Sequence, residues 1–75
     1  MHFNAKQWEY LQEHWQLTPR EIQVAKLICE GYDKEQIAKE LHIAYNTVRV
    51  HLGHIHNKVG VRSRVNLIIK FDDVL

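Results

Sequence analysis

The side chains that could do chemistry in this chain are concentrated between residues 45 and 59, where the sequence predicts a helix. Val48, Leu52, Ile55 and Val59 recur there at helical spacing and form one apolar stripe. The face left outside this stripe carries no carboxylate and consists of Tyr45, Asn46, Arg49, Val50, Gly53, His54 and His56. A helix that buries one face and offers a cationic, acid-free face to solvent is suited to the major groove of DNA.

Charge is distributed unevenly along the 75 residues, although the formal net charge is only +1. The stretches before Leu17 and from Leu17 to Ala44 are both slightly acidic. Between Tyr45 and Arg64 the charged side chains are all basic, namely Arg49, Lys58, Arg62 and Arg64. Basic charge therefore gathers in and just after the predicted helix, where neutralisation of phosphates requires it.

The spacing of the other reactive side chains does not support a metal site or an active site. His51 and His54 are three residues apart, but no Cys or acidic residue in the same helix completes a ligand set, so we expect no metal and no other cofactor. The single Cys29 lies in an apolar run and is expected to be buried. No pair of nucleophile and base and no Gly-rich phosphate loop is present, and we therefore expect no enzyme.

A tight break separates the predicted DNA-facing helix from a shorter helix before it. Ile37, Ala38 and Leu41 share one face of the first helix, and the small Ala38 allows the next helix to approach closely. The break falls at residues 42–44. This arrangement is typical of a helix-turn-helix.

Capping residues mark the boundaries of the other helices. Thr18 is followed by Pro19 and, three residues after the Thr, by Glu21, which together predict a capped start for a helix that runs to about Glu30. The other predicted boundaries are Gly31, Asp33 with Gln36 as its partner, Gly60 and the N-cap Ser63. Before them, Trp8, Leu11 and Trp15 predict a short amphipathic helix over residues 4–15.

The last predicted helix, from Ser63 onward, is apolar on more than one side. Val65, Ile68 and Ile69 can face the core, in which case Leu67 and Phe71 point away from it. Exposed apolar neighbours of this kind usually mark a contact surface. We expect an all-α fold: a four-helix helix-turn-helix domain over residues 17–75, preceded by an extra amphipathic helix in residues 1–16.

From Leu17 to about Ile69 the sequence resembles a LuxR-type DNA-binding domain, the four-helix module of many bacterial transcription regulators. The matching positions are Leu17-Thr18-Pro19-Arg20-Glu21, Val24, Leu27, Gly31, Ile37-Ala38, Leu41, Thr47-Val48, Val50-His51, Ile55, Lys58, Gly60-Val61 and Ser63-Arg64. An ordered match of this length is much more specific than a generic helix-turn-helix motif.

The resemblance implies transcription regulation by a dimer on a pseudo-palindromic duplex site. Bases would be contacted by Arg49, Val50 and Gly53, with Tyr45 on the same face, and phosphates by Asn46, Thr47, Lys58, Arg62 and His54. The dimer contact would come from the last helix, through Val65, Leu67, Ile68 and Phe71. We also expect His51 to have a structural role, His56 to lie near phosphates with His54, and Glu21 to pair with Arg64.

Four positions depart from the pattern of similar domains. Ala44 stands where Ser or Thr usually caps the recognition helix, which forfeits about 1 kcal/mol, and Asn46 compensates only partly. His42 replaces a turn glycine, and a left-handed backbone there would be strained. Gly53 replaces a base-reaching side chain. Ile22 replaces a polar residue, which predicts that the N-terminal helix covers it.

Two other interpretations stay open. One is a protein-interaction module that uses Val65 to Phe71 to pair with a full-length LuxR-type regulator, and the other is a sigma-factor-like DNA-binding domain. Besides double-stranded DNA and a second copy, RNA polymerase or a larger regulator is a candidate partner. No leader and no apolar run near the ~18 residues of a membrane span is present, so we expect a cytoplasmic protein without membrane contact.

Overall fold

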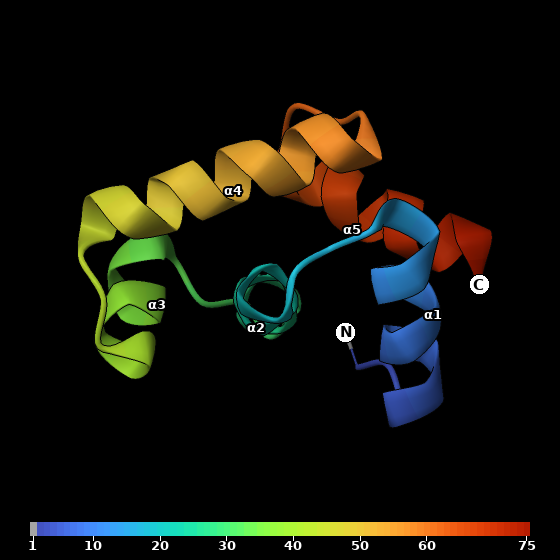
Figure 1. The fold of residues 1–75 in the computed structure, drawn as a ribbon, viewed down its shortest axis with the longest axis horizontal. Coiled ribbons are helices and arrows are strands. Elements are labelled where there is room, and N and C mark those ends of the chain that lie inside the picture. The colour runs from blue at the N-terminus through green and yellow to red at the C-terminus, as the bar shows by residue number, and fades with distance from the viewer. Residues whose placement is uncertain (1) are drawn as a thin grey trace.

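The computed structural model describes residues 2–75 as an all-helical fold (Figure 1). Its elements are α1 (Ala5–Trp15), α2 (Pro19–Cys29), α3 (Lys34–Leu41), α4 (Tyr45–Val59) and α5 (Arg64–Val74), with no strand among the described residues. The predicted all-α class and the extra N-terminal helix are therefore confirmed.

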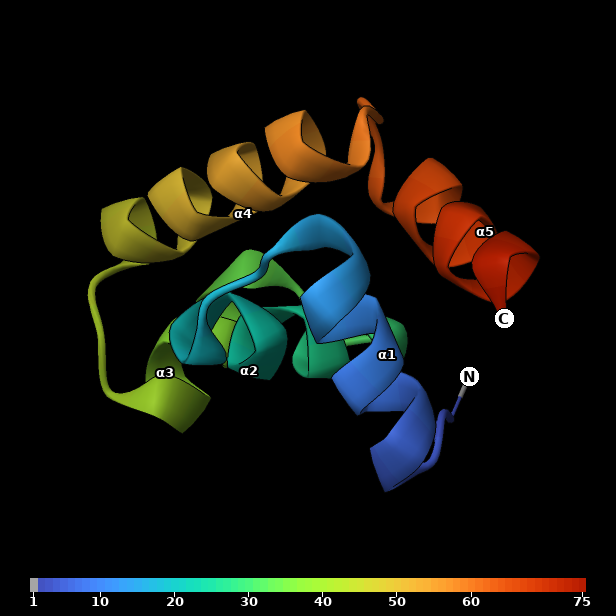
Figure 2. The same ribbon diagram turned by 45° about the vertical axis from the view of Figure 1, so that its right-hand side comes forward.

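The long helix α4 lies across α2 and α3, which form its main packing partners (Figures 1 and 2). α3 meets the beginning of α4, and α2 passes beneath its middle. α1 and α5 lie together near the C-terminal end of α4. Trp8 and Trp15 of α1 both make ring contacts with Phe71 of α5. The outer side of α4 is thus left without a covering helix.

Local capping explains where most of these helices begin. Thr18 and Glu21 form a reciprocal capping box at α2, and Asp33 and Gln36 form another at α3, as the sequence predicts. Ser63 caps α5 by accepting a hydrogen bond from the N–H of Asn66. α1 has a further box, between Asn4 and Gln7, which the hydrophobic pattern alone does not reveal.

The turn between α3 and α4 contains a left-handed residue that is not glycine. His42 has φ 55° and ends α3, so the strain expected from the missing turn glycine is present. Ala44 precedes α4 without any side-chain capping bond, and Asn46 does not replace that bond. α4 therefore begins with N–H groups that no side chain satisfies.

The core is continuous from α1 to α5. Its buried apolar members are Trp8, Leu11, Leu17, Ile22, Val24, Ala25, Ile28, Cys29, Ile37, Val48, Leu52, Ile55, Val59, Leu67 and Phe71. Ile22 is only 7% exposed and belongs to the same core cluster as Trp8 and Leu11, and its coverage by α1 stays a prediction. A chain this short needs that added burial, because small domains bury a low fraction of their surface.

The predicted orientation of α5 is wrong. Leu67 and Phe71 are fully buried, whereas Val65 is 62% and Ile69 55% exposed. The helix is apolar on several sides, so its own pattern could not decide which side turns inward. The aromatic rings of α1 decide it, because Trp8 and Trp15 both pack against Phe71.

Replacing Trp8 tests whether α1 is part of the folded unit. Trp8→Ala should lower the free energy of unfolding by about 3 kcal/mol or more, because a large buried ring is lost from the core. The exposed neighbour Glu9 is the control, since Glu9→Ala should stay within about 0.5 kcal/mol of the parent protein. Urea unfolding measures both, and equal stabilities would show that α1 is only loosely attached.

Candidate DNA-binding surface

The outer face of α4 is an exposed surface without carboxylates. Its exposed side chains are Tyr45, Asn46, Thr47, Arg49, Val50, His54 and Asn57, with Gly53 among them. The opposite stripe of Val48, Leu52, Ile55 and Val59 is buried, as predicted. Burial of one stripe therefore fixes which residues face outward.

Asn57 is an outward-facing residue that the sequence reasoning missed. Asn46, Val50, Gly53 and Asn57 follow the spacing of the buried stripe, displaced to the opposite side of the helix. This spacing was a signal available in the sequence. Asn57 therefore belongs to the surface that a partner of α4 would meet.

The guanidinium of Arg49 lies near the first turn of α4. Its Nη1 lies 3.4 Å from Oδ1 of Asn46, one turn earlier. At this distance the contact is weak, so the guanidinium keeps most of its five donors for another partner. Gly53, one turn later, leaves open space because nothing lies within 4 Å of where its Cβ would be.

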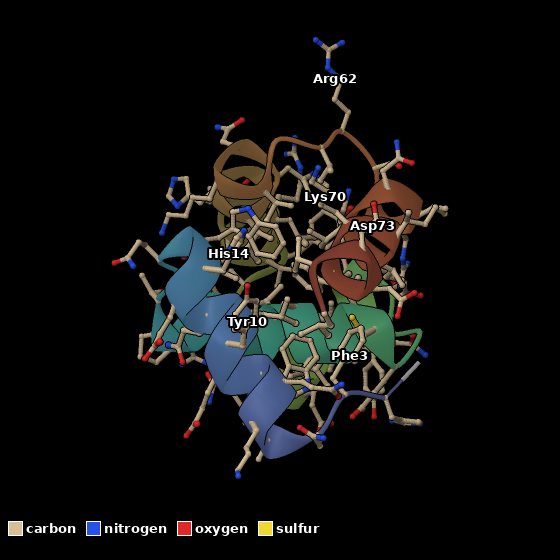
Figure 3. All side chains as sticks on the ribbon, turned by 90° about the vertical axis from the view of Figure 1, so that its right-hand side faces the viewer. Phe3, Tyr10, His14, Arg62, Lys70 and Asp73 are labelled. Atoms are coloured by element: carbon tan, nitrogen blue, oxygen red, sulfur yellow. The ribbon has the colours of Figure 1, made fainter. Side chains whose placement is uncertain are left out.

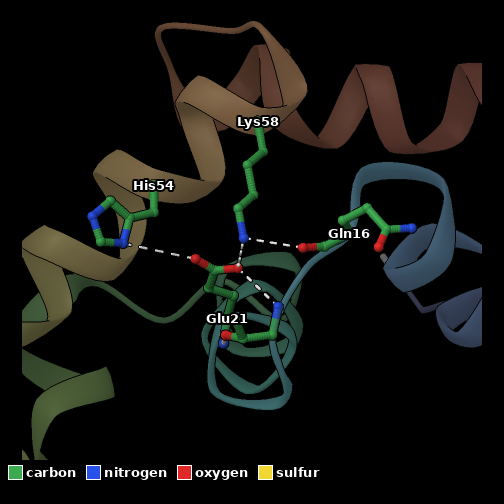
Figure 4. A network of polar contacts seen from close by, with 5 residues as sticks. Gln16, Glu21, His54 and Lys58 are labelled. Carbon is green, nitrogen blue, oxygen red and sulfur yellow. Dashed lines mark hydrogen bonds and ion pairs between the residues drawn. The ribbon is translucent and has the colours of Figure 1, made fainter.

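A buried carboxylate in α2 forms an ion pair with α4 (Figure 4). Glu21 is 2% exposed, and its Oε1 lies 2.7 Å from Nζ of Lys58 in α4. The same Nζ donates to the backbone carbonyl of Gln16 at 3.0 Å, directly after α1. Three helices, α1, α2 and α4, are therefore joined at one cation.

The surroundings of Glu21 favour its charged form. Burial alone would raise the pKa of Glu21, but the hydrogen bonds from Lys58 and Thr18 and the charge of Lys58 outweigh it and lower that pKa. His54 of α4 also approaches, with Nδ1 3.8 Å from Oε2 of Glu21. The carboxylate is thus charged in the folded protein at neutral pH.

The predicted pairing of Glu21 with Arg64 is wrong. Nη2 of Arg64 instead donates to the backbone carbonyls of Tyr32 at 2.6 Å and Ile28 at 3.4 Å. These carbonyls lie at and just after the end of α2, where helix carbonyls lack partners within the helix. Arg64 therefore joins α5 to α2 through the backbone, and Lys58 takes the carboxylate.

This network bears on the phosphate contacts predicted from the sequence. Lys58 has its ammonium engaged with Glu21 and Gln16, so it is not a free cation in the structure. Arg62 is exposed, and its guanidinium extends away from the body of the protein (Figure 3). Asn46 and Thr47 are exposed in the first turn of α4, at the uncapped and electropositive helix end.

The three histidines of α4 occupy different surroundings. The side chain of His54 is 59% exposed on the outer side, as expected. His56 differs from His54, because its Nε2 is buried and its pKa is lowered, first by burial and then by the charge of Lys34; its expected position near phosphates stays a prediction. His56 turns toward α2 and α3 because it follows the buried Ile55 around the helix. His51 is half-buried, and its structural role stays a prediction.

Within residues 2–75, no group of three or more His, Cys, Asp or Glu side chains is arranged to hold a metal ion. Cys29 is buried, as predicted, and burial raises the pKa of its thiol to about 11. Among these residues no helix is both long and apolar enough to cross a membrane.

Glu21→Gln tests the buried ion pair through its pH dependence. A lowered carboxyl pKa stabilises the fold above the ordinary value of 4.5, and this contribution is lost as pH falls through the lower, folded pKa. The variant should therefore be less stable at neutral pH and lose less stability on acidification. Urea unfolding at neutral pH and well below pH 4.5 measures both effects.

The exposed Glu40 provides the control, since Glu40→Gln should keep the acid sensitivity of the parent protein. An identical pH dependence for the parent and Glu21→Gln would contradict the proposed state of Glu21.

Comparison with known proteins finds one family model, described as bacterial regulatory proteins of the luxR family, matching residues 15–71. A putative HTH-type transcriptional regulator of Mycobacterium bovis is 44% identical over 52 residues, 69% of this chain and 6% of that protein. The nitrate/nitrite response regulator protein NarL of Escherichia coli is 43% identical over 54 residues, 72% of this chain and 25% of NarL.

The HTH-type transcriptional regulator MalT of Vibrio campbellii is 37% identical over 59 residues, 79% of this chain and 6% of MalT. The chain thus spans a quarter or less of the length of these relatives. No solved structure gives a significant match. Because the family model covers well over half of the sequence and the helices follow its layout, the chain belongs to the luxR family of bacterial regulatory proteins.

Proposed function

We propose that this domain binds double-stranded DNA at specific sites and regulates transcription, with the outer face of α4 in the major groove. The observation that carries the proposal is the exposed, acid-free face of α4 in a helix-turn-helix of the luxR family. An α-helix fits the major groove, where each base pair presents a distinct pattern of donors and acceptors. Membership of a family of regulatory proteins supports the link to transcription.

The proposed DNA contacts fall into two groups, those to bases and those to phosphates. Arg49 would donate two hydrogen bonds to guanine, Val50 would contact a thymine methyl group, and Tyr45 and Gly53 would lie against the bases between them. Phosphates would be contacted by Asn46, Thr47 and His54 on α4 and by Arg62 after it. Lys58 is left out of this set, because its ammonium already compensates the buried Glu21.

We also propose that two copies bind together through α5. Val65 and Ile69 are one turn apart on the exposed side of α5, and Ile68 lies partly buried at its edge. This surface replaces the one predicted from Leu67 and Phe71, which are in the core. One short helix gives a small interface, so the free dimer should be weak and DNA should assist its assembly.

The alternative function, pairing with a full-length LuxR-type regulator to modulate it, would use the same side of α5. The lack of a side chain at Gly53 favours it, because α4 offers nothing at that position that could reach a base. It predicts no phosphate-driven affinity for DNA. Binding to a non-specific duplex at low salt therefore separates the two functions.

The base-contacting role of Arg49 can be tested on sites selected from a random duplex library. Arg49→Ala should lose about 1 to 3 kcal/mol of discrimination at one base pair and keep most of its non-specific affinity. Arg62→Ala should instead weaken all sequences alike and reduce the salt dependence. Lys39→Ala, at an exposed position of α3, is the control for a lost charge.

If Arg49→Ala and Arg62→Ala lose affinity in the same pattern across site variants, the assigned division between base and phosphate contacts is wrong. If the parent protein selects no site and shows no affinity for any duplex at low salt, the proposed function itself fails.

The dimer surface is tested by Ile69→Asp, which places a charge in the middle of the exposed apolar side of α5. The variant should bind one half-site as the parent does but lose cooperative binding to two half-sites, because a buried unpaired charge opposes pairing. Gln23→Asp adds the same charge at an exposed position of α2 and should leave cooperativity unchanged. Sedimentation with and without duplex measures the number of bound copies, and unaltered pairing of Ile69→Asp would exclude this surface.

A further inference from the structure

A cavity of about 240 Å³ lies beside α4. Its apolar wall is formed by Ile28 and Leu52, and its polar wall by Lys34, His56 and residues 62–64. These residues come from α2, α3, α4 and the connection into α5. The cavity therefore lies where four parts of the fold meet.

The polar wall carries only positive or neutral groups. Lys34 and Arg64 line it, Arg62 stands at its edge, and no carboxylate is among the lining residues. The nearest acidic residues in sequence, Asp33 and Glu35, line a neighbouring hollow with Lys34 and Arg64. Asp33 is already engaged there, since its Oδ1 accepts the N–H of Gln36.

Within this wall, one polar atom lacks a partner. Nε2 of His56 is buried and makes no hydrogen bond with any of the described residues. Buried polar atoms are almost always paired, and an unpaired one costs free energy that a ligand can recover. The pKa of His56 is lowered first by burial and then by the nearby charge of Lys34, and a bound anion would oppose the effect of that charge.

The start of α5 adds a second group of donors to the same wall. Ser63 caps this helix and satisfies the N–H of Asn66, which leaves the N–H groups of Arg64 and Val65 without partners within the helix. The eleven-residue helix presents its positive end here. Arg62 extends into solvent (Figure 3), but an exposed arginine changes rotamer within nanoseconds and can turn inward over a ligand.

We propose that this cavity binds a phosphate-type oxyanion, held by His56, Lys34, Arg62 and the start of α5. The oxyanion could belong to a free phosphate-bearing molecule or to the backbone of a nucleic acid, since both present the same oxygens. The positive charge of Arg64 attracts the anion, while its guanidinium stays hydrogen-bonded to the backbone carbonyls of Ile28 and Tyr32. The proposal concerns a site beside the base-contacting face, and its first test uses no DNA.

The first experiment titrates the whole protein with inorganic phosphate at constant ionic strength and follows the histidine imidazoles by NMR. The signals of His56 should shift and reach saturation, while those of the outward-facing His54 should not. Lys34→Gln and Arg62→Gln should each weaken binding about tenfold, because each removes a charge-assisted contact. Lys39→Gln, an exposed lysine of the same α3, is the matched control and should bind as the parent protein does.

A second experiment adds duplex DNA to the phosphate-saturated protein. If the duplex displaces phosphate from His56, the natural occupant is a backbone phosphate. If both bind together, the site serves a free ligand. Either result leaves the assignment of the cavity standing.

The proposal is overturned if His56 does not respond to phosphate, if its response rises without saturation, or if Lys39→Gln weakens binding as much as Lys34→Gln does. These outcomes would show only an adventitious, general attraction of anions to a basic surface. Because they are measured without DNA, they are distinguishable from a failure of the proposed DNA-binding function.

Discussion

The buried carboxylate of Glu21 constrains how the helices of this domain can pack. Burying a charge is costly unless the charge is paired, so α2 and α4 must pack in an arrangement that keeps Lys58 next to Glu21. The same carboxylate closes the capping box of α2 by accepting the N–H of Thr18. One side chain therefore stabilises both the beginning of α2 and the packing of α2 against α4.

The N-terminal helix α1 makes a polar contact with α4 and apolar contacts with α5. The carbonyl of Gln16 accepts from Lys58, while Trp8 and Trp15 pack on Phe71. α1 thus contacts α4, which carries the proposed DNA-binding surface, and α5, which carries the proposed dimer surface. Movement of α1 would break a hydrogen bond at one and expose apolar rings at the other, so its position and the geometry of both surfaces are coupled.

The sequence predicted features that depend on neighbouring residues and missed those that depend on tertiary packing. The capping boxes of α2 and α3 and the buried stripe of α4 follow from local rules and are confirmed. The inward side of α5 depends on where α1 docks, and the partner of Glu21 depends on whether Lys58 or Arg64 reaches it. Neither could be decided from spacing along one helix. The unpaired Nε2 of His56 likewise becomes evident only when four segments meet.

Gly53 leaves a bare strip of backbone in the middle of the outer face of α4, with nothing within 4 Å of its missing Cβ. Arg49 and Val50 stand before this strip and Asn57 stands after it. With α4 docked as proposed, the base pair opposite Gly53 would meet no side chain. Among the DNA sites that this domain selects, any base pair should therefore be accepted opposite Gly53, although the positions on either side of it are constrained.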